Sequence, residues 1–177
     1  MIYFVLGPGR CGSSAVARVL HTEFNISMGT RFRKADKNNL DGYWEDLDFC
    51  DLNRYMLAGR ITFPEWQIKV GNLIHHRSKN KKAWGLKDPR LCYLFGHYLM
   101  LIDDFVLIRC KRDIKEVINS MCRCYGWSFK NAEKVSNERE RYLDRILKPF
   151  NCIEINFNEQ RTSEYIKNII VKGGIIS

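Results

Sequence analysis

The fold is decided near the start of the chain, by residues 2–14 with the sequence IYFVLGPGRCGSS. The run before Gly7 is continuously apolar and rich in β-prone side chains, which predicts a buried strand. Beyond the glycines, the apolar spacing from Ala15 to Leu20 is typical of a helix. A strand that leads through the spacing G-x-x-x-x-G into a helix predicts a phosphate-binding loop, in which backbone N–H groups surround an anion. The glycines allow the close approach that such binding needs.

Strands and helices alternate along the rest of the chain. Apolar runs predict strands at 83–86, 105–109 and 152–157, and amphipathic spacing predicts helices over 45–57, 64–76, 91–102, 113–124, 129–147 and 162–171. The polar and basic segment 25–43 is predicted to be a long surface loop. This order predicts an α/β fold, a three-layer P-loop domain with a parallel sheet flanked by helices. The length of 177 residues fits a single domain over residues 1–177.

Composition narrows the classes of function. The chain has no stretch of about 18 uninterrupted apolar residues, and its first residues lack the basic region and cleavage site of a signal peptide, so we expect a cytoplasmic protein with no membrane span. The seven cysteines are odd in number and form no C-x-x-C pair, which predicts a reduced compartment and no structural metal. The net charge of +9 favours anionic partners, whether nucleotide, nucleic acid or glycan.

The glycine-rich loop lacks the lysine of a triphosphate-cleaving enzyme. Ser13 stands at that position, and Arg10 supplies positive charge from within the loop instead. A planar guanidinium can form paired hydrogen bonds with phosphate or sulfate oxygens. The residues predicted to bind a nucleotide here are Gly9, Arg10, Cys11, Gly12, Ser13 and Ser14.

A second anion-binding pair is predicted further along the chain. Arg112 follows the strand at 105–109, and Ser120 lies eight residues later on the next predicted helix. The arginine would give charge and the hydroxyl a directed donor, so both could bind one anion. Each residue alone would more often be solvated.

Together these two sites resemble those of the P-loop sulfotransferases. In that family the 5′-phosphosulfate loop has a basic residue, a small residue, a glycine and two hydroxyl residues, as in 10–14, and the 3′-phosphate is bound by residues that match Arg112 and Ser120. Segments 42–46 and 84–90 are also similar to bacterial, viral and carbohydrate sulfotransferases, and the likeness spans residues 2 to about 128. The resemblance implies 3′-phosphoadenosine 5′-phosphosulfate as co-substrate, 3′-phosphoadenosine 5′-phosphate as product, no metal, and a small-molecule or glycan acceptor.

The resemblance also suggests catalytic residues. Many cytosolic sulfotransferases for small phenols and steroids carry a histidine base two residues after a lysine, whereas Lys87 is followed by Asp88 and Pro89. This run is more similar to the lysine-x-proline of glycan sulfotransferases, which use a glutamate base. Glu45 is therefore the predicted general base, with Asp46 as the alternative because the register of this segment is open. Lys87 is predicted to stabilise charge on the leaving group.

Two alternative functions compete with sulfuryl transfer. A P-loop kinase or nucleotide hydrolase is suggested by residues 100–104, MLIDD, which resemble a magnesium-binding strand, but Ser13 and the better strand at 105–108 count against it. A non-catalytic nucleic-acid-binding module is suggested by the basic run 31–34, but the basic residues are spread along the whole chain. Aromatic candidates for stacking on adenine or lining an acceptor groove are Trp44, Trp84, Trp127 and Tyr125.

Overall fold

A computed structural model describes residues 1–79, 81–157 and 162–174. Within them the sheet has four strands, β1 (Ile2–Leu6), β2 (Trp84–Lys87), β3 (Phe105–Lys111) and β4 (Ile153–Asn156). Their order is β2-β1-β3-β4, and every neighbouring pair is parallel. Val5 of β1 lies opposite Lys87 on one side and Ile108 on the other. The predicted parallel sheet is thereby confirmed.

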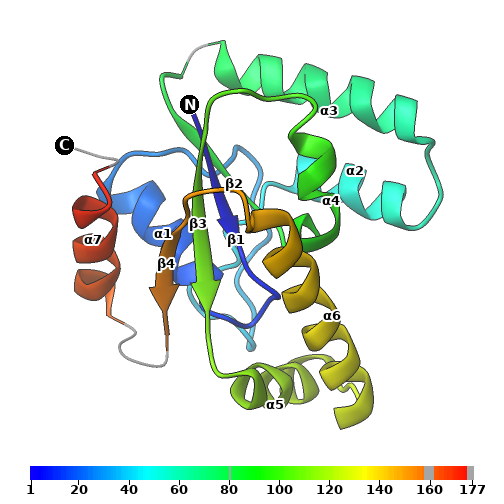
Figure 1. Ribbon diagram of the computed structural model, residues 1–177, viewed down its shortest axis with the longest axis vertical. Helices are drawn as coiled ribbons and strands as arrows, with labels where there is room; N and C mark the ends of the chain where they lie inside the picture. The colour runs from blue at the N-terminus through cyan, green and yellow to red at the C-terminus, as the bar shows by residue number, and fades with distance from the viewer. Residues whose placement is uncertain (80, 158–161, 175–177) are drawn as a thin grey trace.

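Helices cover both faces of this sheet (Figure 1). They are α1 (Ser13–Glu23), α2 (Leu47–Leu57), α3 (Phe63–Ser78), α4 (Leu91–Tyr98), α5 (Ile114–Tyr125), α6 (Phe129–Leu147) and α7 (Ser163–Lys172). Successive β1 side chains point to opposite faces. Tyr3 and Val5 pack in one apolar cluster with α1, α5 and α7, and Phe4 and Leu6 pack in another with α2, α3, α4 and α6. This arrangement confirms the prediction of an α/β fold whose sheet is flanked by helices.

Local sequence signals set the helix ends. Thr62 and Glu65 form a capping box at the start of α3, and the Asp113 carboxylate accepts hydrogen bonds from two backbone N–H groups at the start of α5, as predicted. One helix is shorter than expected. α4 ends at Tyr98, because Leu101 N donates to the Tyr98 carbonyl at 2.9 Å in a tight turn that begins before the predicted end at residue 102.

The fold brings the carboxyl ends of all four strands to one edge of the sheet. The arrowheads of β1, β3 and β4 point to the same edge of the sheet, where α5 also lies (Figure 1). The glycine-rich loop leaves β1 at this edge, residues 88–90 leave β2, and Arg112 follows β3. In open α/β sheets ligands bind at the carboxyl ends of the strands. The predicted site residues are therefore gathered where this architecture places ligands.

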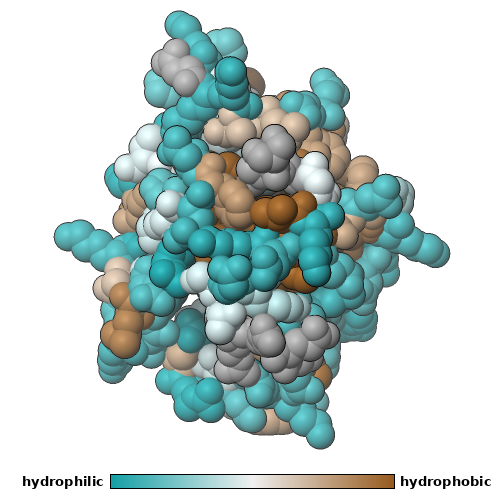
Figure 2. Space-filling view, turned by 90° about the vertical axis from the view of Figure 1, so that its left-hand side faces the viewer, coloured by the Kyte–Doolittle hydropathy of each residue, from teal (hydrophilic) through white to brown (hydrophobic). Residues whose placement is uncertain are grey.

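The face of the molecule that carries α7 is mainly polar. Figure 2 shows it covered mostly by hydrophilic side chains, with hydrophobic side chains gathered in its upper centre. Among the described helices, none is both long enough and apolar enough to cross a membrane.

A buried polar cluster joins β2 to the helical layer formed by α2, α3 and α4. Asn53 of α2 has no exposed surface, and its side-chain Nδ2 donates to Asp88 Oδ2 at 3.0 Å. Its Oδ1 accepts hydrogen bonds from Trp66 Nε1 at 3.2 Å and from the Tyr98 hydroxyl at 2.9 Å. Burial raises the pKa of Tyr98 well above its ordinary value, which keeps the hydroxyl protonated as a donor. One side chain thus satisfies polar groups from three other segments.

We expect Asn53→Ala to lower the free energy of unfolding by about 3 kcal/mol, because each buried polar group left without a partner costs about 1–3 kcal/mol. Urea denaturation followed by circular dichroism measures the change. Asn137→Ala is the matched control, since Asn137 is exposed on α6, and it should shift stability by less than about 0.5 kcal/mol. Equal shifts for the two variants would contradict the role given to Asn53.

Candidate functional site

The glycine-rich loop, residues 7–12, has a backbone that requires glycine. Gly9 and Gly12 have φ values of 89° and 92°, and a Cβ on Gly12 would lie 2.6 Å from the ring of Phe157. Arg10 also has a positive φ, 60°, which is uncommon for a residue with a side chain. Backbone N–H groups of Cys11, Gly12 and Ser14 donate to no acceptor among the described residues. The loop and the start of α1 therefore present free donors to an anion.

Cys11 is a buried part of this loop. A hydrogen bond from the Cys110 thiol and smaller effects of the backbone N–H groups of Ser13 and Gly9 together outweigh burial and lower the pKa of the Cys11 thiol to about 7. Cys11 faces the protein interior, so its part in the site is to hold the loop from behind.

The predicted second anion-binding pair, Arg112 and Ser120, lies directly against the glycine-rich loop. Arg112 Nη1 donates to the Arg10 carbonyl at 3.0 Å, and Arg10 Nε donates to the Ser120 hydroxyl at 3.0 Å. Arg10 Nη2 also donates to the carbonyl of Asn38 at 3.0 Å, and Arg112 Nε pairs with Glu116 at 2.7 Å. Two arginines and one hydroxyl from three segments thus converge at one end of the loop.

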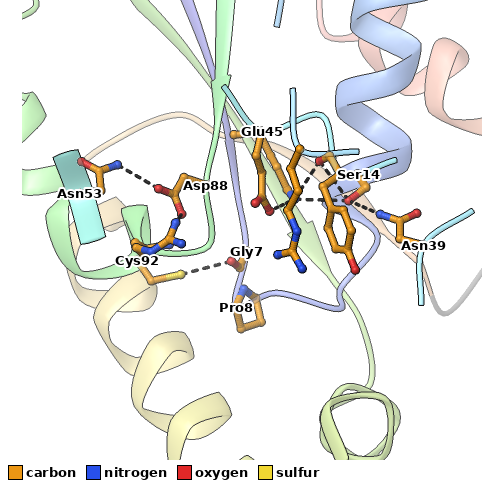
Figure 3. Close-up of polar contacts among 12 residues, drawn as sticks. Gly7, Pro8, Ser14, Asn39, Glu45, Asn53, Asp88 and Cys92 are labelled. Carbon is orange, nitrogen blue, oxygen red and sulfur yellow. Dashed lines mark hydrogen bonds and ion pairs between the residues drawn. The ribbon is translucent and has the colours of Figure 1, made fainter. Parts of the chain in front are cut away.

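Lys87 brings a buried ammonium group to the other end of the loop. It is the last residue of β2, and only 3% of its surface is exposed. Its Nζ donates to Glu45 Oε1 at 2.7 Å, to the Tyr43 carbonyl at 3.1 Å and to Ser14 Oγ at 3.3 Å. Figure 3 shows Glu45, Ser14 and Asn39 on one side of Gly7, with Asn53, Asp88 and Cys92 on the other. The neighbouring strand therefore supplies the lysine that the loop itself lacks.

The two predicted bases occupy different environments. Asp46 caps α2 by accepting a hydrogen bond from Asp48 N at 3.1 Å, and its other carboxylate oxygen is 2.9 Å from buried Arg77. Glu45 instead lines the cavity beside the loop, where it pairs with Lys87. The geometry thus places Glu45, and not Asp46, where a ligand can reach it.

A cavity of about 200 Å³ connects these features. It is lined by loop and α1 residues together with residues from the segment before α2 and from the ends of β2, β3 and α5: Gly9, Arg10, Gly12, Ser13, Ser14, Ala15, Asn39, Asp41, Tyr43, Glu45, Lys87, Pro89, Arg112 and Tyr125. Of the predicted site residues, Cys11, Asp46 and Ser120 are not part of this lining. Within the described ranges, no group of three or more His, Cys, Asp or Glu side chains is arranged to hold a metal.

Sequence reasoning missed the residues that hold the long loop over the cavity. Asn39 Nδ2 donates to Ser14 Oγ at 3.2 Å, and the Tyr43 hydroxyl donates to Asp36 at 2.8 Å. Burial, with a smaller effect of the hydrogen bond to Asp36, raises the pKa of Tyr43 to about 12. The polar and basic composition of residues 25–43 predicted a loop, but it gave no indication of the contact with Ser14.

Two groups of sequence candidates lie elsewhere. Trp84 is buried in the core, where its Nε1 donates to Ser78 Oγ at 3.0 Å, and Trp44 packs against His21 and Phe32. The acidic pair that resembled a magnesium-binding motif lies at the opposite edge of the sheet: Asp104 binds the N-terminal amine at 3.1 Å and its carbonyl accepts from the first residue of β1. That position counts against the kinase alternative.

We expect Asp46→Asn to lower the free energy of unfolding by about 3 kcal/mol, because it leaves the buried Arg77 with a weakened partner set. Asp51→Asn is the matched control. Its carboxylate pairs at the surface with Arg31 and Arg54, and its loss should cost less than about 1 kcal/mol. Guanidinium denaturation of both variants checks this, and shifts of equal size in the two variants would contradict the structural role given to Asp46.

The site combines open backbone donors, two converging arginines and a buried carboxylate–ammonium pair around one cavity. A scan against models of protein families and a search of curated protein sequences both find no match to this chain. The function of the site is therefore inferred from the chemistry of its own residues.

Proposed function

We propose that this protein is a sulfotransferase that moves a sulfuryl group from 3′-phosphoadenosine 5′-phosphosulfate to a hydroxyl or amine of an acceptor. The observation that carries the proposal is the position of Lys87, whose ammonium group touches both Ser14 at the end of the glycine-rich loop and the carboxylate of Glu45. A cation and a proton acceptor thereby stand beside an anion-binding loop. Sulfuryl transfer uses these three elements together.

The donor nucleotide carries anionic groups at two ends, and the cavity has two regions that suit anions. Free N–H groups of the loop and the start of α1 suit the 5′-phosphosulfate. Arg10 and Arg112 line the cavity and suit the 3′-phosphate by charge, while Ser120, behind the lining, accepts a hydrogen bond from Arg10. A nucleoside triphosphate would need only the first region, so the second favours a nucleotide phosphorylated at both positions.

In the proposed reaction the acceptor oxygen or nitrogen bonds to sulfur while the bond from sulfur to the 5′-phosphate oxygen breaks. Glu45 takes the proton that the acceptor loses, and the released nucleotide keeps the bonding electrons as a phosphate oxygen. Lys87 stabilises that developing charge from a buried position, where a fixed cation acts more strongly than in water. The products are a sulfated acceptor and 3′-phosphoadenosine 5′-phosphate.

The ion pair between Glu45 and Lys87 supports this division of roles. Both side chains are at least nine-tenths buried, and their charges compensate each other at 2.7 Å. Only one oxygen of Glu45 receives a hydrogen bond from the described part of the chain. The second oxygen remains available to an acceptor hydroxyl, which is the geometric requirement for a general base.

We expect 3′-phosphoadenosine 5′-phosphate to bind the wild-type protein in a calorimetric titration, and Arg112→Ala to weaken binding by about tenfold to a hundredfold, because a hydrogen bond to a charged group contributes about 1.5–3 kcal/mol. Arg60→Ala is the control, since Arg60 lies exposed in the turn after α2, away from the cavity. It should bind as wild type does. Failure of the wild-type protein to bind this nucleotide would reject the proposal.

Lys87→Met should slow conversion of 3′-phosphoadenosine 5′-phosphosulfate to 3′-phosphoadenosine 5′-phosphate by about a hundredfold or more, because it removes a preorganised charge from the reaction site. Binding of the product nucleotide should change by less than about threefold, a difference below 1 kcal/mol. Radiolabelled donor measures the first quantity, and titration calorimetry the second. Equal losses in turnover and binding would reject the role assigned to Lys87.

A further inference from the structure

A second cavity adjoins the first and contains an excess of positive charge. Its volume is about 320 Å³, and it is lined by Arg33, Tyr43, Glu45, Pro89, Arg90, Tyr125, Trp127 and Arg139. Four of these residues, Tyr43, Glu45, Pro89 and Tyr125, also line the first cavity. We propose that the second cavity binds the acceptor, and that this acceptor is a pyranoside with a carboxylate, an acidic sugar. The identification as an acceptor site rests on the proposed sulfotransferase function; the preference for an acidic ring does not.

The protein balances two of the three arginine charges that line this cavity. Arg90 pairs with buried Asp88 at 2.6 Å, and Arg33 is 3.8 Å from Asp36. The single carboxylate of the lining, Glu45, is already paired with Lys87 outside the arginine group. A ligand with a negative charge would compensate the positive charge of the third arginine, Arg139.

Arg139 of α6 carries the charge that stays without a carboxylate partner. No carboxylate in the described ranges lies within ion-pair distance of its guanidinium. The guanidinium carbon lies 5.7 Å from the centroid of the Tyr93 ring, and Nη1 donates to the carbonyl of Pro8 at 2.7 Å, so the side chain reaches the glycine-rich loop. A ligand carboxylate beside the guanidinium would pair with this charge and would lie close to the reacting groups.

Two aromatic side chains give the same cavity a surface for a ring. Tyr125 ends α5, Gly126 turns the chain with a φ of 67°, and Trp127 follows, with ring centroids 5.3 Å apart. Their exposed fractions are 40% and 37%, so part of each ring surface is open to a ligand beside the cavity. Half-exposed rings of this kind offer an apolar face with a polar edge, which suits a pyranose ring lying flat.

Glu45 fixes the orientation of such an acceptor, because it lies where the two cavities meet. A hydroxyl of the sugar would face Glu45 and Lys87, while the carboxylate would lie among Arg33, Arg90 and Arg139. The arginines thus select the acceptor by charge, and Glu45 selects the hydroxyl that reacts.

The test uses two ligands, p-nitrophenyl β-D-glucuronide and p-nitrophenyl β-D-glucoside. They differ in one group, because the glucuronide carries a carboxylate where the glucoside carries a hydroxymethyl group. Each is titrated into the full-length protein saturated with 3′-phosphoadenosine 5′-phosphate, and also into the protein alone. We expect the wild type to bind the glucuronide about tenfold or more tightly than the glucoside, a difference of about 1.4 kcal/mol.

Variants of the lining residues test whether the preference for the glucuronide arises in the second cavity. Arg33→Gln and Arg139→Gln should each reduce it to about threefold or less, Trp127→Ala should weaken both glycosides alike, and Arg60→Gln should behave as wild type. Arg33 and Trp127 serve as checks on Arg139, whose substitution also removes the contact with Pro8. Thermal unfolding of each variant confirms that it is folded.

The proposal is overturned if the two glycosides bind equally, if neither binds, or if the preference survives in both arginine variants. Its failure is distinguishable from failure of the sulfotransferase function. If the protein binds the nucleotide but does not distinguish the glycosides, the proposal of an acidic acceptor is rejected and the proposed sulfotransferase function is retained. If the protein prefers the glucuronide through Arg33 and Arg139 but does not bind the nucleotide, the acidic-sugar site is retained and the sulfotransferase function is rejected.

Discussion

The buried ammonium group of Lys87 connects the parts of the site. It ends β2 at the edge of the sheet where β1 gives way to the glycine-rich loop, and it bonds to Ser14, to the Tyr43 backbone and to Glu45. A buried cation must be paired, and this requirement draws the long loop before α2 down onto the loop after β1. The parallel register of β1 and β2 sets Val5 opposite Lys87. This register fixes where along the strands the two loops come into contact.

Much of this arrangement is readable from the sequence, because its determinants are local. The strand, glycine-rich loop and helix at residues 2–23, the cap at Asp113 and the strand end before Arg112 follow from patterns of a few residues. Parallel pairing then places strand ends at one edge by topology alone. The convergence of Arg10, Arg112 and Ser120 is a consequence of that topology, since no long-range contact had to be guessed.

The remaining features depend on contacts between distant segments. Whether Glu45 or Asp46 faces the cavity is set by Asp46, which caps α2 and pairs with Arg77, a partner some thirty residues away on α3. In the sequence, Arg139 does not differ from a solvated arginine on the exposed face of a helix. In the structure α6 brings it to Pro8, to whose carbonyl it donates a hydrogen bond. Helical periodicity identifies a helix and its apolar face, but it does not say which charged residue at the edge of that face will meet another loop.

Two walls of the second cavity differ in how strongly the core constrains them. Arg90 is held by Asp88, which Asn53 holds in turn from the helical layer, so this wall is tied to the stability of the core. Arg33 and Trp127 come from connecting segments, and few core contacts constrain them. Substitutions in loops are tolerated far better than those in a core. Under the proposed function, related chains could therefore acquire new acceptors by exchanging the loop wall, while Glu45, Lys87 and the wall with Arg90 stay in place.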